Sequence, residues 1–399
     1  MRTTALSGNF SGVTAGLPLL FYADGYRFPD VYHLTRFLSP DAIIALEDGN
    51  EVVIVANSLE EGRARKQSRA TTIFNIDAFG AKELSARGIG REELDANVIA
   101  RFLASRNTKE VAVGPYFPLG MAERLRALGI EVGVATDLDQ RRRVKRQDEL
   151  DALEATQRAC EDGWARGVDA IRRATVRKDR TLELDGEVFT AERLRAIVEG
   201  RLLELGCASD GTICAPGPQA ADPHMSGTGP LHAGEPIVMD IFPQHKSTRY
   251  WADMTRTVSK GQPSAEIVKM YDLVKRAQDA GIAALRPGVT GRSIHEMVED
   301  LIFAAGYDTL RPGQQHGPKQ NGALPKGFIH GLGHGVGLEI HEAPSVGRGG
   351  SAPLLAGDVV TVEPGVYDPA IGGVRLEDML VITETGSRNL TRAPRQLIV

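Results

Sequence analysis

The most informative segment of this 399-residue chain is His330-Gly-Leu-Gly-His334-Gly-Val-Gly-Leu-Glu-Ile-His341-Glu342. Its glycines alternate with other residues from Gly331 to Gly337, and each would cost about 1 kcal/mol inside a helix. We therefore expect an extended or looped segment, which excludes a helical zinc site of the HExxH type. The G-x-G-x-G-x-G spacing also differs from the G-x-G-x-x-G of a dinucleotide-binding loop. Alternating glycine instead permits close backbone approach along a strand, with histidines that project into a cavity.

Four carboxylates occur in apolar, strand-like contexts on both sides of this segment, and they are Asp240, Asp253, Glu363 and Glu377. They belong to a faint internal repeat, because Leu231–Asp240 matches Leu354–Glu363, with Gly234 and Gly357 in equivalent places. A second carboxylate follows each copy, after 13 residues in the first and 14 in the second. We expect each pair of acids to span two adjacent strands of one hairpin, in two related halves. Chance similarity of two strand–turn signals is the alternative.

These acids are best explained together, because a buried carboxylate is costly unless it is paired or bound to a metal. Four carboxylates carry a charge of about −4, which two divalent ions would roughly neutralise while two of the acids bridge them. Eight of the nine histidines follow residue 223, so imidazole ligands are also available. We therefore expect a dinuclear site. Oxygen donors with one imidazole suit Mn, Co, Zn or Fe, and the sequence does not choose among them.

The N-terminal part, residues 1 to about 140, alternates short apolar runs with helical patterns, as in an α/β layer. The expected strands are 52–56, 110–114 and 130–134, and the expected helices are 91–106 and 120–128. A basic run at 141–146 opens a long helix and marks a domain boundary, and we interpret this run as a solvated linker. Further helices are expected at 190–205, 264–285 and 293–305, the last with a capping box of Ser293 and Glu296.

Composition places the chain among ordinary globular proteins, with 42% hydrophobic and 25% charged residues. A formal net charge of −5 provides no general attraction to nucleic acid or to an anionic membrane. No apolar run approaches the roughly 20 residues that a membrane-spanning helix needs. Three cysteines, with no basic-then-apolar leader at residues 3–10, predict a cytoplasmic location.

Five motifs, taken in order, carry a family resemblance: MetAspIlePhe (239–242), AlaAspMetThrArgThr (252–257), the histidine segment (330–342), ValGluProGlyValTyr (362–367) and GlyValArgLeuGluAsp (373–378). They resemble the M24 metallopeptidase family of creatinase-like pita-bread fold, in its Xaa-Pro dipeptidase (prolidase) and aminopeptidase P branch. The resemblance covers nearly the whole chain. It implies an α/β N-terminal domain over 1–145, followed over 146–399 by an α+β pita-bread catalytic domain with pseudo-two-fold halves.

The resemblance also implies roles for the metal ligands. By motif, Asp240 would bind one of two divalent ions, and His334 with Glu363 would bind the other. Asp253 and Glu377 would bridge both ions.

The residues that the resemblance implies for catalysis are Glu363, His341, His224, His330 and Arg375. Glu363 would shuttle a proton, whereas His224 and His341 would stabilise the oxyanion. His330 matches a histidine of the substrate pocket, and Arg375 would orient a metal-binding carboxylate. Tyr367 matches a family tyrosine as well, but packing explains it equally well.

The activity implied is hydrolysis of the Xaa-Pro imide bond at the N-terminus of dipeptides or short peptides, by a hydroxide that bridges two metals. A homodimer is also implied. A metal-dependent hydrolase or lyase of this fold that acts on another small amide or on a sulfonium compound is the alternative. A peptide-binding module without catalysis, or a metal-free amidinohydrolase, is less consistent with five retained ligands.

Two segments depart from the family pattern. The hairpin between Asp240 and Asp253 is enlarged, and the segment 311–327 is long and rich in Gly, Pro and Gln. Both put the size of the substrate in doubt but remove no ligand. We expect His245 and His316, which lie in these segments, at the surface.

Overall fold

The computed structural model describes residues 16–315 and 326–399. Residues 3–10, for which we expect no leader, lie outside these ranges, as do His316 and most of the segment 311–327.

The described chain divides into two compact units between Arg141 and Arg142, and each unit is described by itself. None of the helices within the described ranges is long and apolar enough to cross a membrane.

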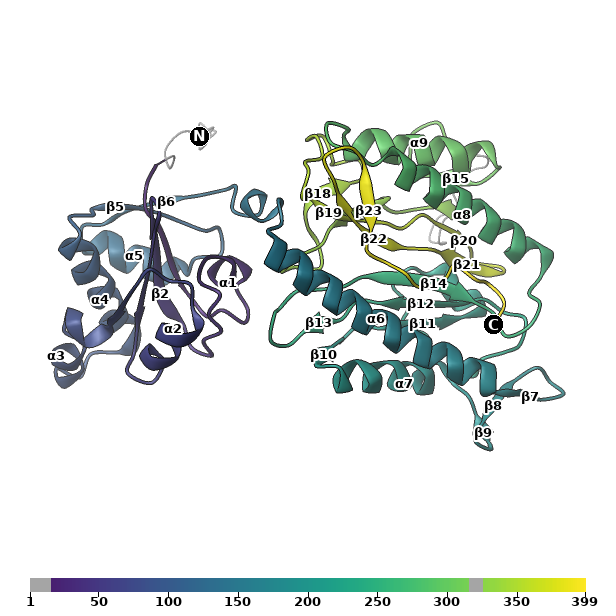
Figure 1. The fold of residues 1–399 in the computed structure, drawn as a ribbon, viewed down its shortest axis with the longest axis horizontal. Helices are drawn as coiled ribbons and strands as arrows, with labels where there is room; N and C mark the ends of the chain where they lie inside the picture. Colours follow the sequence, from purple (N-terminus) through teal and green to yellow (C-terminus); the bar gives the residue numbers. More distant parts are fainter. Residues whose placement is uncertain (1–15, 316–325) are drawn as a thin grey trace, which may run out of the picture. The chain divides into compact units, whose positions relative to one another are not determined.

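The first unit is built on a six-stranded sheet of order β4-β3-β2-β1-β5-β6 (Figure 1). Its strands are β1 (Leu19–Ala23), β2 (Ile43–Asp48), β3 (Glu51–Ala56), β4 (Thr72–Asn75), β5 (Glu110–Val113) and β6 (Glu131–Val134). β2 pairs antiparallel with β1 and β3, whereas β3–β4, β1–β5 and β5–β6 are parallel pairs. The predicted α/β class of this part is confirmed.

Helices cover both faces of this sheet. Successive residues of a strand point to opposite faces, so apolar side chains on each face are buried by a different set of helices. Leu20 and Leu46 pack in one cluster with α3 (Ala81–Ala86), α4 (Arg91–Ser105) and α5 (Leu119–Ala127). Leu19 and Phe21 pack in another with α1 (Pro29–Thr35) and α2 (Glu61–Gln67). Short 3-10 helices occur at η1 (Ile76–Phe79) and η2 (Gln140–Arg142).

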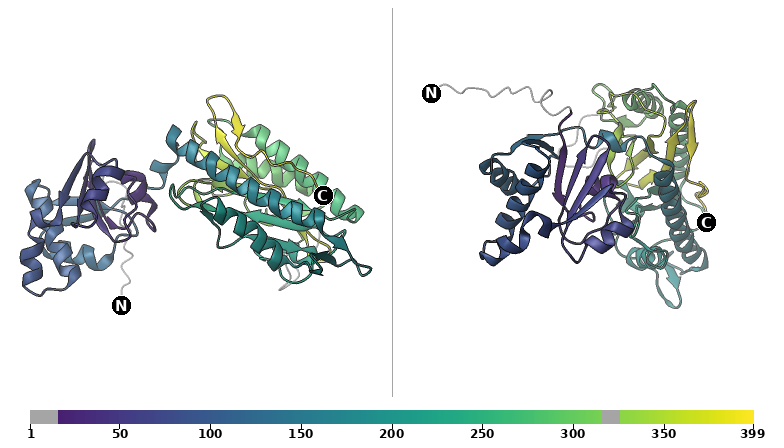
Figure 2. Two further views of the ribbon diagram at one scale, coloured as in Figure 1. Left: turned by 60° about the horizontal axis from the view of Figure 1, so that its bottom comes forward. Right: turned by 60° about the vertical axis from the view of Figure 1, so that its left-hand side comes forward.

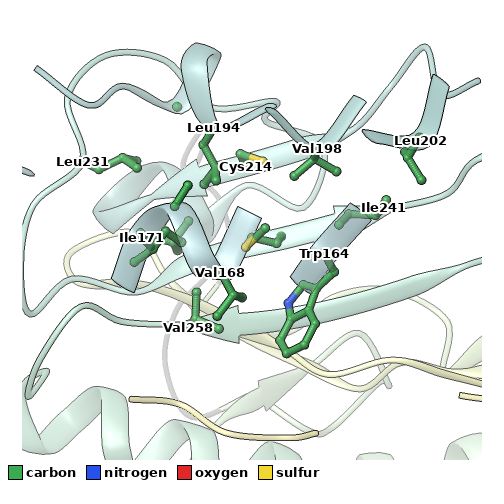
Figure 3. Close-up of a cluster of buried hydrophobic side chains, with 14 of the residues drawn as sticks. Trp164, Val168, Ile171, Leu194, Val198, Leu202, Cys214, Leu231, Ile241 and Val258 are labelled. Atoms are coloured by element: carbon green, nitrogen blue, oxygen red, sulfur yellow. The ribbon is translucent and has the colours of Figure 1, made fainter. Parts of the chain in front are cut away.

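The first half of the second unit places a helix pair on three antiparallel strands. Its members are α6 (Gln147–Arg173), α7 (Ala191–Glu204), β11 (Ile213–Pro216), β12 (Ile237–Ile241) and β14 (Met254–Val258). Trp164 and Val168 of α6 and Val198 of α7 belong to one cluster of buried hydrophobic side chains (Figure 3). Gly167 lets α6 approach the sheet, because a Cβ there would lie 2.8 Å from Met239 on β12.

Shorter elements complete this half. They are β7 (Thr175–Val176), β8 (Leu182–Leu184), β9 (Glu187–Val188), β10 (Cys207–Ala208), β13 (Gln244–His245) and the 3-10 helix η3 (Gly217–Ala221). His245 is half-buried in β13 rather than at the surface as expected, because β13 pairs with β10.

The second half packs α8 (Ala265–Ala284) and α9 (Gly291–Ala304) against a sheet of order β18-β17-β19-β22-β23. Its strands are β17 (Gly333–Gly335), β18 (Glu342–Val346), β19 (Val359–Val362), β22 (Asp378–Ile382) and β23 (Ser387–Asn389). A second sheet contains β15 (Asp308–Thr309), β16 (Gly327–Phe328), β20 (Gly365–Asp368) and β21 (Gly372–Arg375).

The two halves repeat one arrangement, since β11-β12-β14 and β17-β19-β22 are both antiparallel and in equivalent order. The pairs α6–α7 and α8–α9 flank the strands of this unit (Figures 1 and 2). The predicted pseudo-two-fold halves are therefore confirmed.

The interpretation of 141–146 as a solvated linker is wrong. Arg142, Arg143 and Lys145 are buried. Each contacts a carboxylate far along the chain, in the pairs Arg142–Glu339, Arg143–Asp358 and Lys145–Glu342. Burial of these cations is possible because no charge is left without a partner.

The predicted capping box of α9 is also wrong. The N-cap is Thr290, whose hydroxyl oxygen accepts a hydrogen bond from the Ser293 N–H at 3.2 Å. The helix therefore begins at Gly291, two residues before the predicted start, because a competing cap residue stands upstream.

Candidate metal centre

The four acids of the internal repeat lie beside two pairs of adjacent strands. Asp240 is on β12, and Asp253 directly precedes β14, the antiparallel neighbour of β12. Glu363 directly follows β19, and Glu377 directly precedes β22, again an antiparallel neighbour. The second pair does not form the simple hairpin that we expected, because β20 and β21 lie between these acids and belong to another sheet.

His334 brings the glycine-rich segment to these acids. Its Nε2 lies 3.5 Å from Asp253 Oδ2 and 3.5 Å from Glu363 Oε1. One ligand atom each of Asp253, His334 and Glu377 lie within 4.8 Å of one another. The extended backbone and close approach predicted for this segment are confirmed, because a Cβ on Gly333 would clash with the neighbouring strand β19.

Burial and mutual repulsion govern the protonation of the cluster. Burial, and then the charge of Glu377, raise the pKa of Asp253 and of Glu363 well above the ordinary values. Burial, and then the charge of Asp240, raise the pKa of Glu377 to about 7. Burial lowers the pKa of His334 to about 4, so its imidazole is neutral near pH 7 and has a lone pair to donate.

A divalent cation fits this set of donors. Asp240 Oδ1 is buried and has no hydrogen-bond partner among the described residues, whereas its Oδ2 accepts from Arg375. A buried acceptor of this kind requires an explanation such as a bound ion. Carboxylates with one neutral imidazole are ligands that Mn, Fe, Co and Zn bind, and a cation would offset the repulsion among the acids.

Arg375 of β21 is buried beside the acids and donates to three neighbours. Its Nη2 donates to Asp240 Oδ2 at 2.6 Å, its Nη1 to the Tyr367 hydroxyl at 3.0 Å and its Nε to Thr255 Oγ1 at 3.2 Å. Thr255 in turn donates to Glu377 Oε2 at 2.8 Å. Arg375 thus orients one acid directly and a second through Thr255.

His330 is hydrogen-bonded at both ring nitrogens. Nδ1 lies 2.8 Å from the Gly331 carbonyl oxygen, which can only accept, so Nδ1 carries the proton. Nε2 then accepts from the Tyr367 hydroxyl at 2.8 Å. Burial lowers the pKa of His330 to about 3, so the ring is neutral.

His341 and His224 lie at the exposed side of the cluster. The His341 ring contacts the His334 ring edge to face, with 4.3 Å between centroids. Burial lowers the pKa of His341, Asp240 opposes this effect and His224 adds to it, so both residues lie within electrostatic reach.

Three supporting residues were missed by sequence reasoning: Thr255, Thr361 and Gln157. Tyr367 was noted as a match to a family tyrosine but was given no role in the site. Gln157 Oε1 accepts from the Asp253 N–H at 3.3 Å, and Thr361 Oγ1 accepts from the His334 N–H at 3.2 Å. Thr255 follows Asp253 by two residues, so the period of a strand could have placed both on one face. No motif pointed to Gln157, which is buried within α6.

A sequence model of metallopeptidase family M24 matches residues 151–384. The chain is 32% identical over 330 residues to the uncharacterized peptidase YqhT of Bacillus subtilis, which covers 82% of this chain and 78% of that relative. It is 35% identical over 188 residues to the Xaa-Pro dipeptidase of Pyrococcus furiosus, covering 47% of this chain and 49% of that relative.

One solved structure shows the same fold over the full length. It is the X-Pro aminopeptidase of Thermotoga maritima, with a TM-score of 0.78 and 24% identity, covering 97% of this chain and 98% of that chain.

Proposed function

The chain belongs to metallopeptidase family M24, and on this premise we propose that it hydrolyses the imide bond between an N-terminal residue and proline in dipeptides or short peptides. The observation that carries the proposal is the cluster of His334 with four acids, in which Asp240 Oδ1 has no hydrogen-bond partner among the described residues.

We propose two divalent ions in this cluster. The four carboxylates and the guanidinium of Arg375 carry a formal charge of −3 when all are ionised. One divalent ion would leave the cluster negative, whereas two ions and one hydroxide would neutralise it. In this assignment Asp240 would hold one ion, and His334 with Glu363 would hold the other. Asp253 and Glu377 would contact both.

Metal ions held here would supply Lewis-acid chemistry, which activates a water molecule and polarises the scissile carbonyl. Glu363 holds the proton of the nucleophile and passes it to the proline nitrogen, which leaves as a secondary amine. His341 and His224 donate hydrogen bonds to the developing oxyanion, an effect typically of about 3 kcal/mol for each donor. Arg375 keeps Asp240 oriented. His330 contributes shape rather than a proton, because both of its ring nitrogens are already engaged.

Specificity for proline is supported by the name of one relative, the Xaa-Pro dipeptidase of Pyrococcus furiosus, which matches about half of this chain. The imide nitrogen carries no hydrogen, so a pocket for Xaa-Pro must recognise the shape of the ring. Formation of homodimers stays a prediction, which light scattering would test.

Peptide cleavage by the metal-loaded protein tests the proposal. The protein is loaded with Mn, Co or Zn and offered Ala-Pro, a longer peptide that begins Ala-Pro, and Ala-Ala as the matched control. Mass spectrometry should show cleavage of the Ala-Pro bond, and elemental analysis should find about two ions per chain. Turnover of another small amide or of a sulfonium compound, with no cleavage at proline, would favour the alternative hydrolase or lyase. Metal binding without any turnover would favour a peptide-binding module.

A further inference from the structure

The proposed function leaves two parts of the chain without a role, the basic run at 141–146 and the enlarged hairpin between Asp240 and Asp253. Both contact the loop that joins His334 to His341. We infer that Trp251 of the hairpin and Lys145 of the basic run are positioning residues for His341. The inference rests on the proposed function, because that function assigns His341 to the oxyanion.

The loop 336–341 connects β17 to β18 and is closed by the pairing of Gly335 with Glu342. His341 is its last residue, so the position of the His341 ring depends on the path of the loop. Gly337 lies against Glu342 so closely that a Cβ would clash with the carboxylate. Glycine gives the backbone many accessible conformations. Contacts from outside the loop are therefore needed to fix one path.

Trp251 supplies two such contacts. Its backbone N–H donates to the Gly337 carbonyl oxygen at 2.9 Å, and its indole Nε1–H donates to the Leu338 carbonyl oxygen at 3.1 Å. Trp251 is itself held, because the adjacent Tyr250 is buried and donates its hydroxyl to Glu149 Oε1 of α6 at 2.7 Å. The other arm of the hairpin is held by the pairing of β13 with β10. Both arms of the hairpin are therefore anchored to other segments of the second unit.

Lys145 fixes the end of the loop next to His341. Its Nζ donates to Glu342 Oε1 at 2.7 Å and to the carbonyl oxygens of Arg142 and Arg143 at 2.7 and 3.2 Å, which uses all three N–H groups. Both side chains of the Lys145–Glu342 pair are 1% exposed. The second oxygen of Glu342 accepts from the Glu339 N–H at 3.3 Å, so the same carboxylate also binds the loop backbone.

These contacts bind the loop that ends at His341 and the residue that follows it, whereas His334 is held separately. His334 lies within β17, and its N–H is bound to Thr361 of β19. Weakening the contact of Trp251 should therefore displace the His341 ring, while the metal ligand stays in place. Since a misplacement of about 1 Å can cost about 100-fold in rate, the loss is expected in kcat rather than in metal content.

The test compares the two tryptophans of the chain. Trp251→Phe removes the indole hydrogen bond to the loop. Trp164→Phe is the matched control, because Trp164 Nε1 has no hydrogen-bond partner within the described chain. For Trp251→Phe we expect kcat on an Ala-Pro peptide to fall about tenfold, with KM within about twofold and with unchanged metal content. Hydrogen–deuterium exchange of residues 336–342 should be faster. Trp164→Phe should show none of these changes.

An unchanged kcat in active Trp251→Phe protein would overturn the inference, and so would a loss of metal in proportion to kcat. A second variant, Lys145→Met with Glu342→Gln, leaves neither buried group charged and should repeat the loss in kcat at constant metal content. Wild-type kcat in this variant would overturn the role of Lys145. If the wild-type protein cleaves no Xaa-Pro peptide, the proposed function fails. Exchange of residues 336–342 in Trp251→Phe would still decide whether Trp251 holds the loop.

Discussion

Without bound metal, the second unit should become less stable as the pH rises. Burial, and then Asp240, raise the pKa of Glu377 from 4.5 to about 7. Between pH 4.5 and about pH 7, the Glu377 carboxyl group is protonated in the folded chain and ionised in the unfolded chain. Its contribution to the free energy of unfolding is therefore fully present below pH 4.5 and is lost as the pH rises through 7. At about 1.4 kcal/mol for each pKa unit, this contribution is about 3 kcal/mol, and Asp253 and Glu363 act in the same direction.

Urea-induced unfolding of the EDTA-treated protein at several pH values between 5 and 8 would measure this effect. Tryptophan fluorescence reports on the second unit, because both tryptophans lie in it. With Mn or Co present the dependence on pH should largely disappear, since a bound cation takes the place of the protons. Glu377→Gln is the control and should reduce the pH dependence of the metal-free protein, with Asp253 and Glu363 leaving part of it. Equal or greater stability at pH 8 than at pH 5 in metal-free wild-type protein would refute this account of the cluster.

Three further predictions concern single side chains. His341→Ala should lower kcat about 100-fold while the metal is retained. His334→Ala should instead lose metal and activity together. Equal loss of metal in both variants, measured by elemental analysis, would contradict their assigned roles. Arg143→Met should lower the free energy of unfolding by about 3–5 kcal/mol in urea titrations, because it leaves the buried Asp358 carboxylate without its cation. Adding Asp358→Asn to the same chain should restore much of the lost stability. A cost below about 1 kcal/mol would argue against this pair. Thr290→Ala should cost about 1 kcal/mol in thermal unfolding, and no change would mean that Thr290 does not cap α9.

Elements with a local signal could be predicted from the sequence. The strand expected at 52–56 is Glu51–Ala56, and the helix expected at 264–285 is Ala265–Ala284, because hydrophobic periodicity and flanking polar residues mark both. The acids could be found for a similar reason, since each stands in an apolar strand context where a lone charge is costly. Hydrophobic periodicity describes one segment at a time, so it gave no information on which distant residues that segment contacts.

Contacts between distant segments could not be predicted in this way. Lys145 belongs to a run of basic residues, and such runs are usually solvated. It is buried because Glu342, 197 residues further on, supplies a carboxylate at 2.7 Å. A role for Tyr367 could not be predicted for the same reason, since only the fold brings its hydroxyl to His330. Ser293 was taken for an N-cap, although the structure shows that Thr290 performs that role.

The internal repeat accounts for the acids of the candidate metal centre but not for its histidine. Ala215 of β11 pairs with the residue two positions before Asp240. His334 of β17 binds Thr361, two positions before Glu363, so the histidine stands where the first half has a buried alanine. Repetition of the strand pattern alone would produce a symmetric cluster of carboxylates. The single imidazole makes the two sides chemically different, with a nitrogen donor beside Glu363 and only oxygen donors beside Asp240. Two ions bound in this cluster would therefore occupy unlike positions.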